Sequence, residues 1–566
     1  MTMHDLPSFD IRHVPFSRRG AWLGVSPVVA AHRTHRLLHL VSHRTGMHAV
    51  LSLSPLVAGA AIDADVRADP ASLAWHLPGG GVVRAAFEPD GAMRIRGTAG
   101  SGMILADATS ELTPFTGVYL FRDPLDGSAV FTSYETGCRY RVTPVAARLD
   151  LEGAEALGAA DRRVIVDGGD RDWEIAVEEF DTARPPYSTS RGFDDLVAQT
   201  RAEFAEYLDA IAPWRSERTP AAALAGYVLW ASTVSAAGFL QRESVLMSKH
   251  WMDKVWSWDH CFNALALVPG LDACAWDQFM VPFDHQESSG ALPDSVAHSE
   301  RLYNFVKPPI HGWALQRMRR AGLRLDATRL RIAYDRLSRW TRFWLDSRRM
   351  PGNALPSYQH GNDSGWDNST LFDRDRVVEA PDLVAFLLLQ LDALVDLAAE
   401  LGEDATSWRT AAELLRDAWT DRLWRDGFTA RGVWSGAASK RTSLLTLIPL
   451  VASAHLDPEV VDVLAADVRR FLTPWGLATE TVDSADYQPD GYWRGPIWAP
   501  STLLIEDGLR TGGHIELANE VSARFRRLCE ASGFAENFDA LTGEGLRDRA
   551  YTWTAAVYLV LARDAV

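Results

Sequence analysis

The segment from 361 to 370, GNDSGWDNST, places acid and amide side chains around an aromatic ring. Asp363, Asp367 and Asn368 flank Trp366 and Gly365. Gly, Asn, Asp and Ser are also the residues of ordinary turns, so the segment predicts a loop. A carboxyl held against the tryptophan would have a raised pKa, because burial disfavours its charged form. Such a carboxyl can act as a general acid near neutral pH.

A second segment, WMDKVWSWDHCFNALAL (251–267), places Trp256, Trp258 and Asp259 just before an apolar helical run. Asp259 is explained either as a helix cap or as a side chain that grips hydroxyl groups while a tryptophan stacks on a sugar ring. The two roles are compatible, because a capping carboxylate keeps one oxygen free. The adjacent His260 and Cys261 do not have the spacing of a metal site, and we expect neither a metal nor a cofactor.

The third and fourth segments lie near the C-terminal end. YQPDGYWRGPIWAPS (487–501) surrounds Arg494 with Tyr492, Trp493 and Trp498, an aromatic density in a turn that core packing explains poorly. GFAENFDALTGEG (533–545) contains Glu536, which taken alone is explained equally well as a surface acid. A functional site is therefore indicated only by the whole constellation.

The stretch between the segments at 251–267 and 361–370 contains candidates for a polar rim. Asp294, Tyr303, Asn304 and His311 lie in the stretch 287–315, which leads through Pro308 and Pro309 into a helical pattern. Each of the four is more readily explained as a structural residue than as a ligand-binding one. Tyr303 is retained as a candidate for substrate binding.

Glycosidic bond cleavage uses this combination of side chains. Two carboxyl groups act on the bond, one protonating the leaving oxygen and the other attacking the sugar or activating water. Aromatic and polar side chains hold the sugar ring. The sequence contains no GxxxxGK[ST] loop, HExxH motif or GxSxG elbow, which disfavours nucleotide hydrolysis, zinc proteolysis and α/β-hydrolase chemistry.

Helices must position these loops. From residue 193 apolar residues recur at helical spacing, and twelve helical stretches are predicted. Twelve helices in six hairpins predict an (α/α)6 barrel, although no sequence repeat supports the count. The predicted starts lie near 193, 219, 258, 309, 326, 381, 406, 440, 457, 498, 514 and 550.

The first part of the chain has a different pattern. The runs 48–57, 82–100, 117–134 and 162–180 are rich in β-forming residues and contain turn sequences such as PDG and PLDG. They predict an antiparallel β-sandwich. Pro185, Pro186 and the polar run 187–192 form a plausible linker. We therefore predict a β-sandwich domain over 1–190 and a helical catalytic domain over 191–566.

The overall composition excludes some partners. The formal net charge is −17, with 74 acidic against 57 basic residues, which argues against nucleic-acid binding. We expect no membrane partner, because no apolar run is long enough to span a bilayer, and a cytoplasmic location, because no signal-peptide pattern begins the chain. The four cysteines form no CxxC pair. The sequence leaves open whether the protein forms a homo-oligomer.

Four segments, in order, carry a family resemblance: WSWDHCFNALAL, SGWDNS, GYWRGPIW and FAENFDALTG. Together they resemble the blocks of glycoside hydrolase family 63, which includes processing α-glucosidases and the mannosylglycerate and glucosylglycerate hydrolases. The resemblance covers residues 220–565 and implies an (α/α)6 barrel. The β-rich residues before it place the chain nearer the members with a β-sandwich in front than the small glycerate hydrolases.

The resemblance also implies roles. Asp367 corresponds to the general acid and Glu536 to the general base of an inverting reaction on a small α-glucoside or α-mannoside. The two carboxyl groups of such an enzyme lie about 6.5–9.5 Å apart. No residue is assigned to a substrate carboxylate, although Arg374, Arg376 and Arg494 could face an anionic group. The implied sugar pocket is lined by Trp256, Trp258, Asp259, Gly365, Trp366, Tyr492, Trp493 and Trp498, with Arg494 beside it.

Other functions stay open. A trehalase, a debranching-like glucosidase, or an epimerase or lyase could use the same barrel, and several histidines are available for proton transfer. A carbohydrate-binding protein with an inactive barrel is the alternative from another class. Retention of both carboxyl groups favours hydrolysis over the other reactions and over binding alone.

Overall fold

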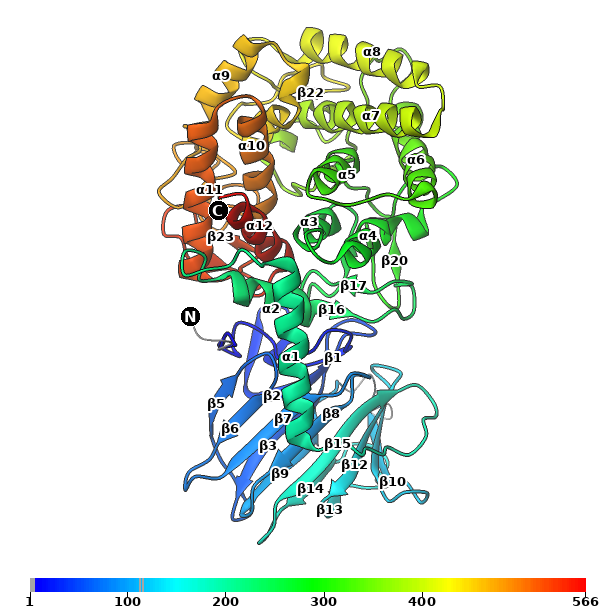
Figure 1. Ribbon diagram of the computed structural model, residues 1–566, viewed down its shortest axis with the longest axis vertical. Helices are drawn as coiled ribbons and strands as arrows, with labels where there is room; N and C mark the ends of the chain where they lie inside the picture. The colour runs from blue at the N-terminus through cyan, green and yellow to red at the C-terminus, as the bar shows by residue number, and fades with distance from the viewer. Residues whose placement is uncertain (1–5, 111–112, 114–116, 566) are drawn as a thin grey trace.

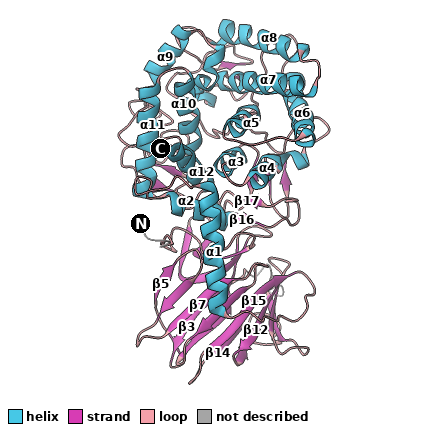
Figure 2. Ribbon diagram, viewed as in Figure 1, coloured by secondary structure: helices cyan, strands magenta, loops and turns pink. Residues whose placement is uncertain are grey.

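The computed structural model describes residues 6–110, 113 and 117–565. Figure 1 shows two parts, an N-terminal pair of β-sheets and a ring of helices, with one long helix running between them. Figure 2 shows that the strands gather in the first part and the helices in the second. In the described residues, no helix has both the length and the apolar character needed to cross a bilayer.

The N-terminal part is a sandwich of two antiparallel sheets. One sheet has the order β1-β2-β3-β9-β14-β13, with β4 paired to β3, and the other has the order β10-β11-β12-β15-β8-β7-β6-β5. The strands are β1 (Leu23–Ala30), β2 (Arg33–Ser42), β3 (His48–Val57), β4 (Ala60–Ala61), β5 (Asp65–Ala68), β6 (Leu73–His76), β7 (Val82–Phe87), β8 (Met93–Gly97), β9 (Ser101–Asp107), β10 (Val118–Arg122), β11 (Ala129–Ser133), β12 (Arg139–Ala146), β13 (Leu149–Glu152), β14 (Arg163–Asp167) and β15 (Trp173–Phe180).

One apolar core lies between the two sheets. Leu53 and Leu105 face it from the first sheet, and Val83, Ile95 and Ile175 face it from the second. The predicted run 48–57 is β3, and the runs 82–100, 117–134 and 162–180 each hold two strands with the predicted turn between them. The antiparallel N-terminal region is therefore confirmed.

Helix α1 (Phe193–Ile211) connects the sandwich to the ring. Its first turn packs Phe193, Leu196 and Val197 against Ala71 and Ala86 of the sandwich. Its later part contacts α2 (Ala222–Ser232). The helix thus spans the junction of the two parts, directly after the proline-containing linker.

The helical part is a closed ring of six inner elements with a second layer outside. The inner elements contact one another in the order α3, α5, α7, η5, α10, α12 and back to α3. Outside them, α2 packs on α12, α4 on α3, α6 and α8 on α7, α9 on η5 and α11 on α10. The bounds are α3 (Asp259–Leu267), α4 (Asp272–Met280), α5 (His311–Arg320), α6 (Ala327–Arg342), α7 (Pro381–Leu401), α8 (Thr406–Leu423), η5 (Leu444–His455), α9 (Pro458–Val468), α10 (Ala499–Thr511), α11 (Ile515–Ser532) and α12 (Thr552–Arg563).

The predicted set of helices differs from this arrangement in three places. The first predicted helix, α1, lies between the sandwich and the ring and is not a member of the ring. Helix α4 was not predicted, because its short sequence DACAWDQFM follows α3 after only a brief turn. The element predicted near 440 is the 3₁₀ segment η5, which contains Pro449 and a kink at Ala452.

Short paired segments hold the loops of the ring. β18 (Val255–Trp256) pairs with β19 (Ser295–Val296), which pairs with β20 (Arg301–Leu302). β23 (Asn537–Phe538) pairs with β24 (Gly545–Leu546). The remaining short elements are β16 (Thr233–Val234), β17 (Ser244–Val245), β21 (Val378–Glu379), β22 (Arg431–Gly432), η1 (Pro282–His285), η2 (Phe343–Ser347), η3 (Gly361–Ser364) and η4 (Thr370–Phe372).

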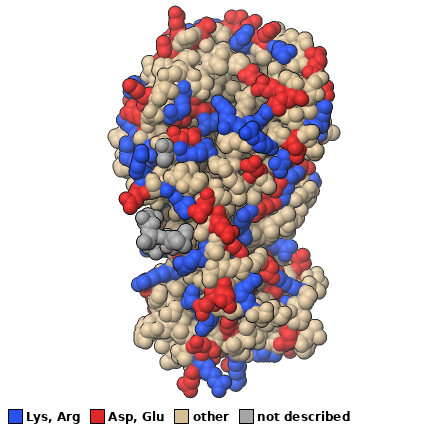
Figure 3. Space-filling model, viewed as in Figure 1, with Lys and Arg blue, Asp and Glu red and all other residues tan. Residues whose placement is uncertain are grey.

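The visible surface carries both signs of charge. Figure 3 shows basic and acidic side chains interspersed over the sandwich and the ring on this face. Exposed ion pairs occur on the protein, such as the one between Arg36 and Asp63. Pairs of this kind contribute little to stability.

Candidate active site

The four segments singled out in the sequence share one position in the fold, because each leads into an inner element of the ring. Trp258 is the residue before α3, and Trp498 is the residue before α10. The loop with Asp367 leads to α7, and the loop with Glu536 leads to α12. Asp259 is the first residue of α3, where the helix start favours negative charge.

Backbone contacts join the loops to one another. Asn368 donates from its amide to the carbonyl of Gly491 at 3.0 Å and accepts from the N–H of Trp493 at 3.0 Å. Ile497 and Phe538 exchange backbone hydrogen bonds of 2.7 and 3.0 Å. Residues that are far apart in the sequence therefore form one continuous surface.

That surface contains a cavity with an aromatic wall. It includes two of the acids discussed above and one buried lysine. The lining residues are Met252, Trp256, Trp258, Asp259, Lys307, Gly365, Asp367, Tyr492, Trp493, Tyr551 and Trp553.

Asp367 opens into this cavity beside a cation. Its Oδ1 lies 3.8 Å from Nζ of Lys307, which also lies 3.1 Å from Oδ1 of Asp294. Lys307 donates in addition to the carbonyl of Asn362 at 3.0 Å. Burial raises the pKa of Asp367, and the Lys307 ammonium opposes that rise. Asp367 therefore retains its proton to a higher pH than an exposed aspartate does.

Lys307 is held in its charged form. Burial alone would lower its pKa, but the carboxylates of Asp367, Asp294 and Asp259 outweigh this effect and raise the pKa. The ammonium is surrounded by more carboxyl groups than it can neutralise. The remaining negative charge adds to burial, which is the larger cause of the raised pKa of Asp367 and of Asp259.

Glu536 is a buried carboxyl that does not line the cavity itself but lies next to Tyr492, which does. Burial, with the charge of Asp548, raises its pKa to about 8, and a hydrogen bond from Tyr492 opposes the rise. The pKa of Tyr492 is raised by burial and then by both Glu536 and Asp367. Tyr492 therefore lies within the electrostatic reach of both carboxyl groups.

The backbone around Glu536 is strained. Tyr492 and Arg547 have positive φ values of 64° and 59°, which are uncommon for residues other than glycine. The guanidinium of Arg547 lies 4.9 Å from the centre of the Tyr492 ring. Strained residues of this kind cluster at functional sites, where the surrounding structure holds them in place.

Two buried polar atoms of the cavity residues are unpaired. Among the described residues, Oδ2 of Asp259 and Nε1 of Trp553 find no hydrogen-bond partner. Burial raises the pKa of Asp259 to about 8, while Lys307 opposes the rise. An unpaired acceptor and an unpaired donor in one cavity suit a ligand rich in hydroxyl groups, because buried polar atoms normally find partners.

Tryptophan rings support the wall from behind. Trp493 stacks on Trp498 with ring centres 4.0 Å apart and planes at 6°. Trp366 lies 4.6 Å from Trp493 on a tilted plane. A Cβ atom on Gly365 would lie 2.5 Å from the ring of Trp258, and its φ of +76° also favours glycine. This glycine lets the acid-bearing loop approach the tryptophan closely.

Four predicted binding residues lie outside the lining. Trp366 and Trp498 are buried behind it. Arg494 forms an ion pair with Asp373. Tyr303 is 39% exposed and donates its hydroxyl proton to the carbonyl of His285 at 2.8 Å. Direct contact with a substrate was predicted because aromatic and basic side chains are concentrated in these loops. In the structure, two of the four are packed behind the lining, one is paired with an acid and one is hydrogen-bonded to the backbone.

Four lining residues were not predicted from the sequence, namely Met252, Lys307, Tyr551 and Trp553. Lys307 had a usable signal, because it is one of four lysines in the chain and directly precedes Pro308 and Pro309. Tyr551 and Trp553 lie in a pattern that also fits the start of a buried helix. Their position at the cavity depends on closure of the ring between α12 and α3.

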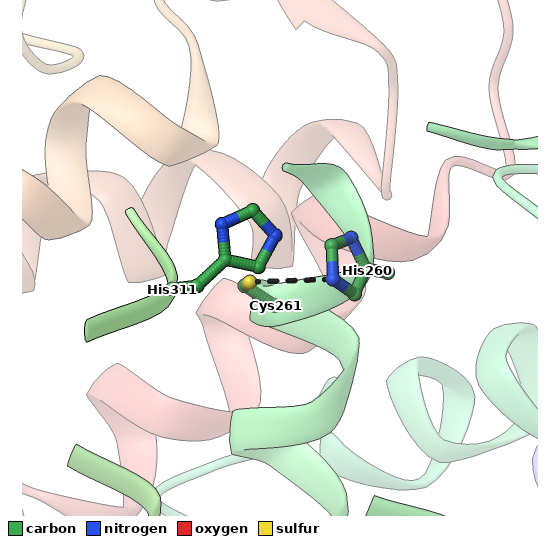
Figure 4. Close-up of side chains that lie close together, drawn as sticks. All are labelled: His260, Cys261 and His311. Atoms are coloured by element: carbon green, nitrogen blue, oxygen red, sulfur yellow. Dashed lines mark hydrogen bonds between the residues drawn. The ribbon is translucent and has the colours of Figure 1, made fainter. Parts of the chain in front are cut away.

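A cluster of three potential metal ligands lies in the buried wall next to the site. Figure 4 shows His260, Cys261 and His311, whose ligand atoms lie within 4.8 Å of one another. Nδ1 of His260 donates to the carbonyl of Trp256 at 3.0 Å, and its Nε2 lies 3.6 Å from the sulfur of Cys261. Nδ1 of His311 accepts from the indole of Trp340 at 3.2 Å.

This hydrogen bond leaves the proton of a neutral His311 ring on Nε2, where it blocks coordination. Burial lowers the pKa of His260 to about 4 and keeps that ring neutral as well. The donor set therefore fits a hydrogen-bonded core cluster behind Asp259 better than a metal site.

Known proteins provide independent information. The family model described as "Mannosylglycerate hydrolase MGH1-like glycoside hydrolase domain" matches residues 252–554. The mannosylglycerate hydrolase of Rubrobacter radiotolerans is 25% identical over 398 residues, covering 54% of this chain and 89% of that protein. The glucosylglycerate hydrolase of Mycolicibacterium hassiacum is 23% identical over 448 residues, covering 60% of this chain and 97% of that protein.

Solved structures agree on the fold. A GH63 mannosylglycerate hydrolase from Thermus thermophilus covers 61% of this chain and 100% of its own, with a TM-score of 0.53 and 21% identity. A bacterial glucoamylase complexed with acarbose covers 99% of this chain and 96% of its own, with a TM-score of 0.61 and 10% identity. This second match includes the β-sheet region. The chain belongs to the MGH1-like family of glycoside hydrolases.

Proposed function

We propose that the protein is an inverting glycoside hydrolase that cleaves the α-glycosidic bond of a small glucoside or mannoside. Asp367 is the general acid and Glu536 the general base. The observation that carries the proposal is that Asp367 and Tyr492 line one tryptophan-walled cavity, and that the buried Glu536 of a separate loop accepts a hydrogen bond from Tyr492. A reaction with one acid and one base requires such a pair of carboxyl groups.

Asp367 protonates the leaving oxygen. Its raised pKa lets the carboxyl hold its proton to a higher pH than an exposed aspartate does, as a general acid requires. Lys307, 3.8 Å away, then stabilises the carboxylate that forms when the proton leaves. The ammonium lowers the pKa of Asp367 by less than burial raises it, so Asp367 can hold its proton until the bond breaks.

Glu536 takes a proton from the attacking water. Its hydrogen bond to Tyr492 orients the carboxyl group. Inversion needs room for this water between base and sugar, so we expect the two carboxyl groups to lie about 6.5–9.5 Å apart with substrate bound. Asp259 and Trp553 supply the unpaired acceptor and donor that hold sugar hydroxyls.

We propose the (α/α)6 barrel as the catalytic fold and residue 190 as the end of the β-sandwich domain. The closed inner ring and its outer layer support the barrel assignment. The last strand of the sandwich ends at Phe180 and α1 begins at Phe193, on either side of that boundary. The substrate belongs to the class cleaved by the relatives, glucosides or mannosides with a small second group.

Two variants test the catalytic roles. Asp367→Asn and Glu536→Gln should each lower kcat roughly 10²–10⁴-fold, because each removes one proton-transfer step. Released monosaccharide should be measured against a panel of glucosides, mannosides and glycerate glycosides, with circular dichroism as a check on folding. Near-normal turnover by either variant would overturn the assignment.

The stereochemistry is tested separately. Proton NMR of the fresh reaction should show the β-anomer of the released sugar first, because water attacks from the face opposite the leaving group. An initial α-anomer from an α-glycoside would contradict inversion while leaving hydrolysis intact. An unsaturated product would point to a lyase.

A further inference from the structure

A buried network of ionisable side chains lies behind Glu536 and takes no part in the reaction proposed above. Asp548 is fully buried and accepts a hydrogen bond of 2.6 Å from the hydroxyl of Ser248. Its other oxygen lies 2.9 Å from Nδ1 of His250. The N–H of Ala550 also donates to Asp548, at 3.0 Å. A carboxylate with this many donors stays ionised although it is buried.

Asp548 is joined directly to Glu536. The N–H of Glu536 donates to the carbonyl of Asp548 at 2.7 Å. Arg547, which precedes Asp548, has the positive φ described above and donates to the side-chain oxygen of Asn537 at 2.9 Å. Glu536 and Asn537 on one segment are therefore hydrogen-bonded to Asp548 and Arg547 on the other.

The loop that holds Asp548 is anchored in turn to the β-sandwich. Lys249 is fully buried and donates to the hydroxyl of Ser17 at 2.7 Å and to the carbonyl of Ala21. Nδ1 of His43 in the sandwich lies 3.1 Å from Oδ2 of Asp253. The loop between these anchors includes Met252, which lines the cavity. The sandwich thus holds the loop that positions Asp548.

We propose that Asp548 is a positioning residue for Glu536, held ionised by Ser248 and His250, and that its charge tunes the basicity of the general base. This inference rests on the proposed role of Glu536. The ionisable groups that influence the pKa of Glu536 are Asp548, Tyr492 and Arg547. Those that influence the pKa of Asp548 include His250. Of these, Asp548 is the one whose negative charge strengthens the base.

The direction of the effect is fixed by charge. A fixed negative charge makes it harder for Glu536 to ionise, and Asp548 acts on its pKa in this direction, second to burial. A base with a higher pKa takes a proton from water more readily once it is ionised. Removing the charge should therefore make Glu536 ionise at lower pH and act as a weaker base.

The test is the pH dependence of kcat/KM for Asp548→Asn, which keeps the shape and removes the charge. The acidic limb should move to lower pH by about one unit, and kcat at the optimum should fall. Asp548→Glu, which keeps the charge, should leave the limb at the parent position. The matched control is Asp507→Asn, a buried aspartate that binds Trp313 and Arg317 and should leave the limb in place.

The outcomes separate this inference from the proposed function. If Glu536→Gln is inactive but Asp548→Asn keeps the acidic limb of the parent, Asp548 is only a structural residue and the inference fails. If Glu536→Gln keeps its turnover, the proposed function itself fails. If Asp548→Asn does not fold, Asp548→Ser, which removes the charge with a smaller side chain, decides between the two results by its pH profile.

Discussion

The β-sandwich and the cavity both bury charged side chains, but they pair them differently. In the sandwich, Arg94 is bound by Glu174 and Glu88, and Arg141 binds Glu178 at 2.6 Å with both side chains at most 3% exposed. Each of these buried guanidinium groups has a carboxylate partner. At the cavity, carboxyl groups outnumber the cations beside them.

This difference separates a structural use of charge from the catalytic use proposed for the cavity. A matched buried pair fixes geometry, and breaking it leaves a charge without compensation. Burial raises the pKa of Asp259 and of Glu536 to about 8, and neighbouring carboxyl groups add to the rise. Carboxyl groups that titrate near neutral pH can donate and accept protons. The comparison predicts that variants in the two regions affect different measured quantities.

The largest effect on stability is expected for Arg141→Met. This change removes the fully buried partner of Glu178, leaves it only the partly exposed Arg184 at 2.8 Å, and should lower the free energy of unfolding by about 3 kcal/mol. Urea denaturation measures the loss, while kcat of the folded protein should stay unchanged. The exposed pair supplies the control, since Arg36→Met should leave the denaturation midpoint unchanged.

A double variant sharpens the same comparison. Arg141→Met combined with Glu178→Leu removes both charges and should recover much of the lost stability. If the single variant is as stable as the parent, matched burial of charge is not what holds the sandwich together.

A smaller effect, of opposite sign, is expected for Glu536→Gln. Glu536 has a folded pKa of about 8 against an ordinary value of 4.5, so between these values the folded state holds a proton that the unfolded chain has lost. The parent therefore loses stability as the pH rises through this window. The variant never ionises and should be more stable than the parent at pH 8.5, on the order of 1–3 kcal/mol, and equally stable near pH 4.5.

Thermal unfolding of parent and variant over this pH range measures the difference. A variant less stable than the parent at pH 8.5 would show that Glu536 is structurally matched in the way Glu178 is.

The smallest effect is expected for Lys307→Gln. The ammonium lowers the pKa of Asp367, so its removal should raise that pKa and move the basic limb of kcat/KM to higher pH by about one unit or less. Lys440→Gln, which alters an exposed lysine, is the control. A basic limb that moves to lower pH would show that Asp367 is not the acid that this limb reports.

Local sequence patterns predicted much of this molecule. Strand and turn residues predicted β3, two hairpins of the sandwich and the strand pair β14 and β15, which lie in different sheets, and four unusual segments predicted Trp256, Asp259, Asp367 and Tyr492 at one cavity. Lys307 and Trp553 were missed because their importance depends on which residues face them across the ring. The role of α1 was missed for the same reason, since its amphipathic pattern does not reveal whether it packs on a sheet or on helices.

The ring closes where α12 meets α3, and Ser248 reaches Asp548 across 300 residues of sequence. A chain leaving the ribosome can fold its sandwich and early helices, but it cannot assemble the acid, the base and the cavity until residues 552–563 have emerged. Contacts between such distant residues form slowly, because a long segment of chain must first be ordered. Activity should therefore appear in a single late step of biogenesis, so that incomplete chains have no hydrolase activity.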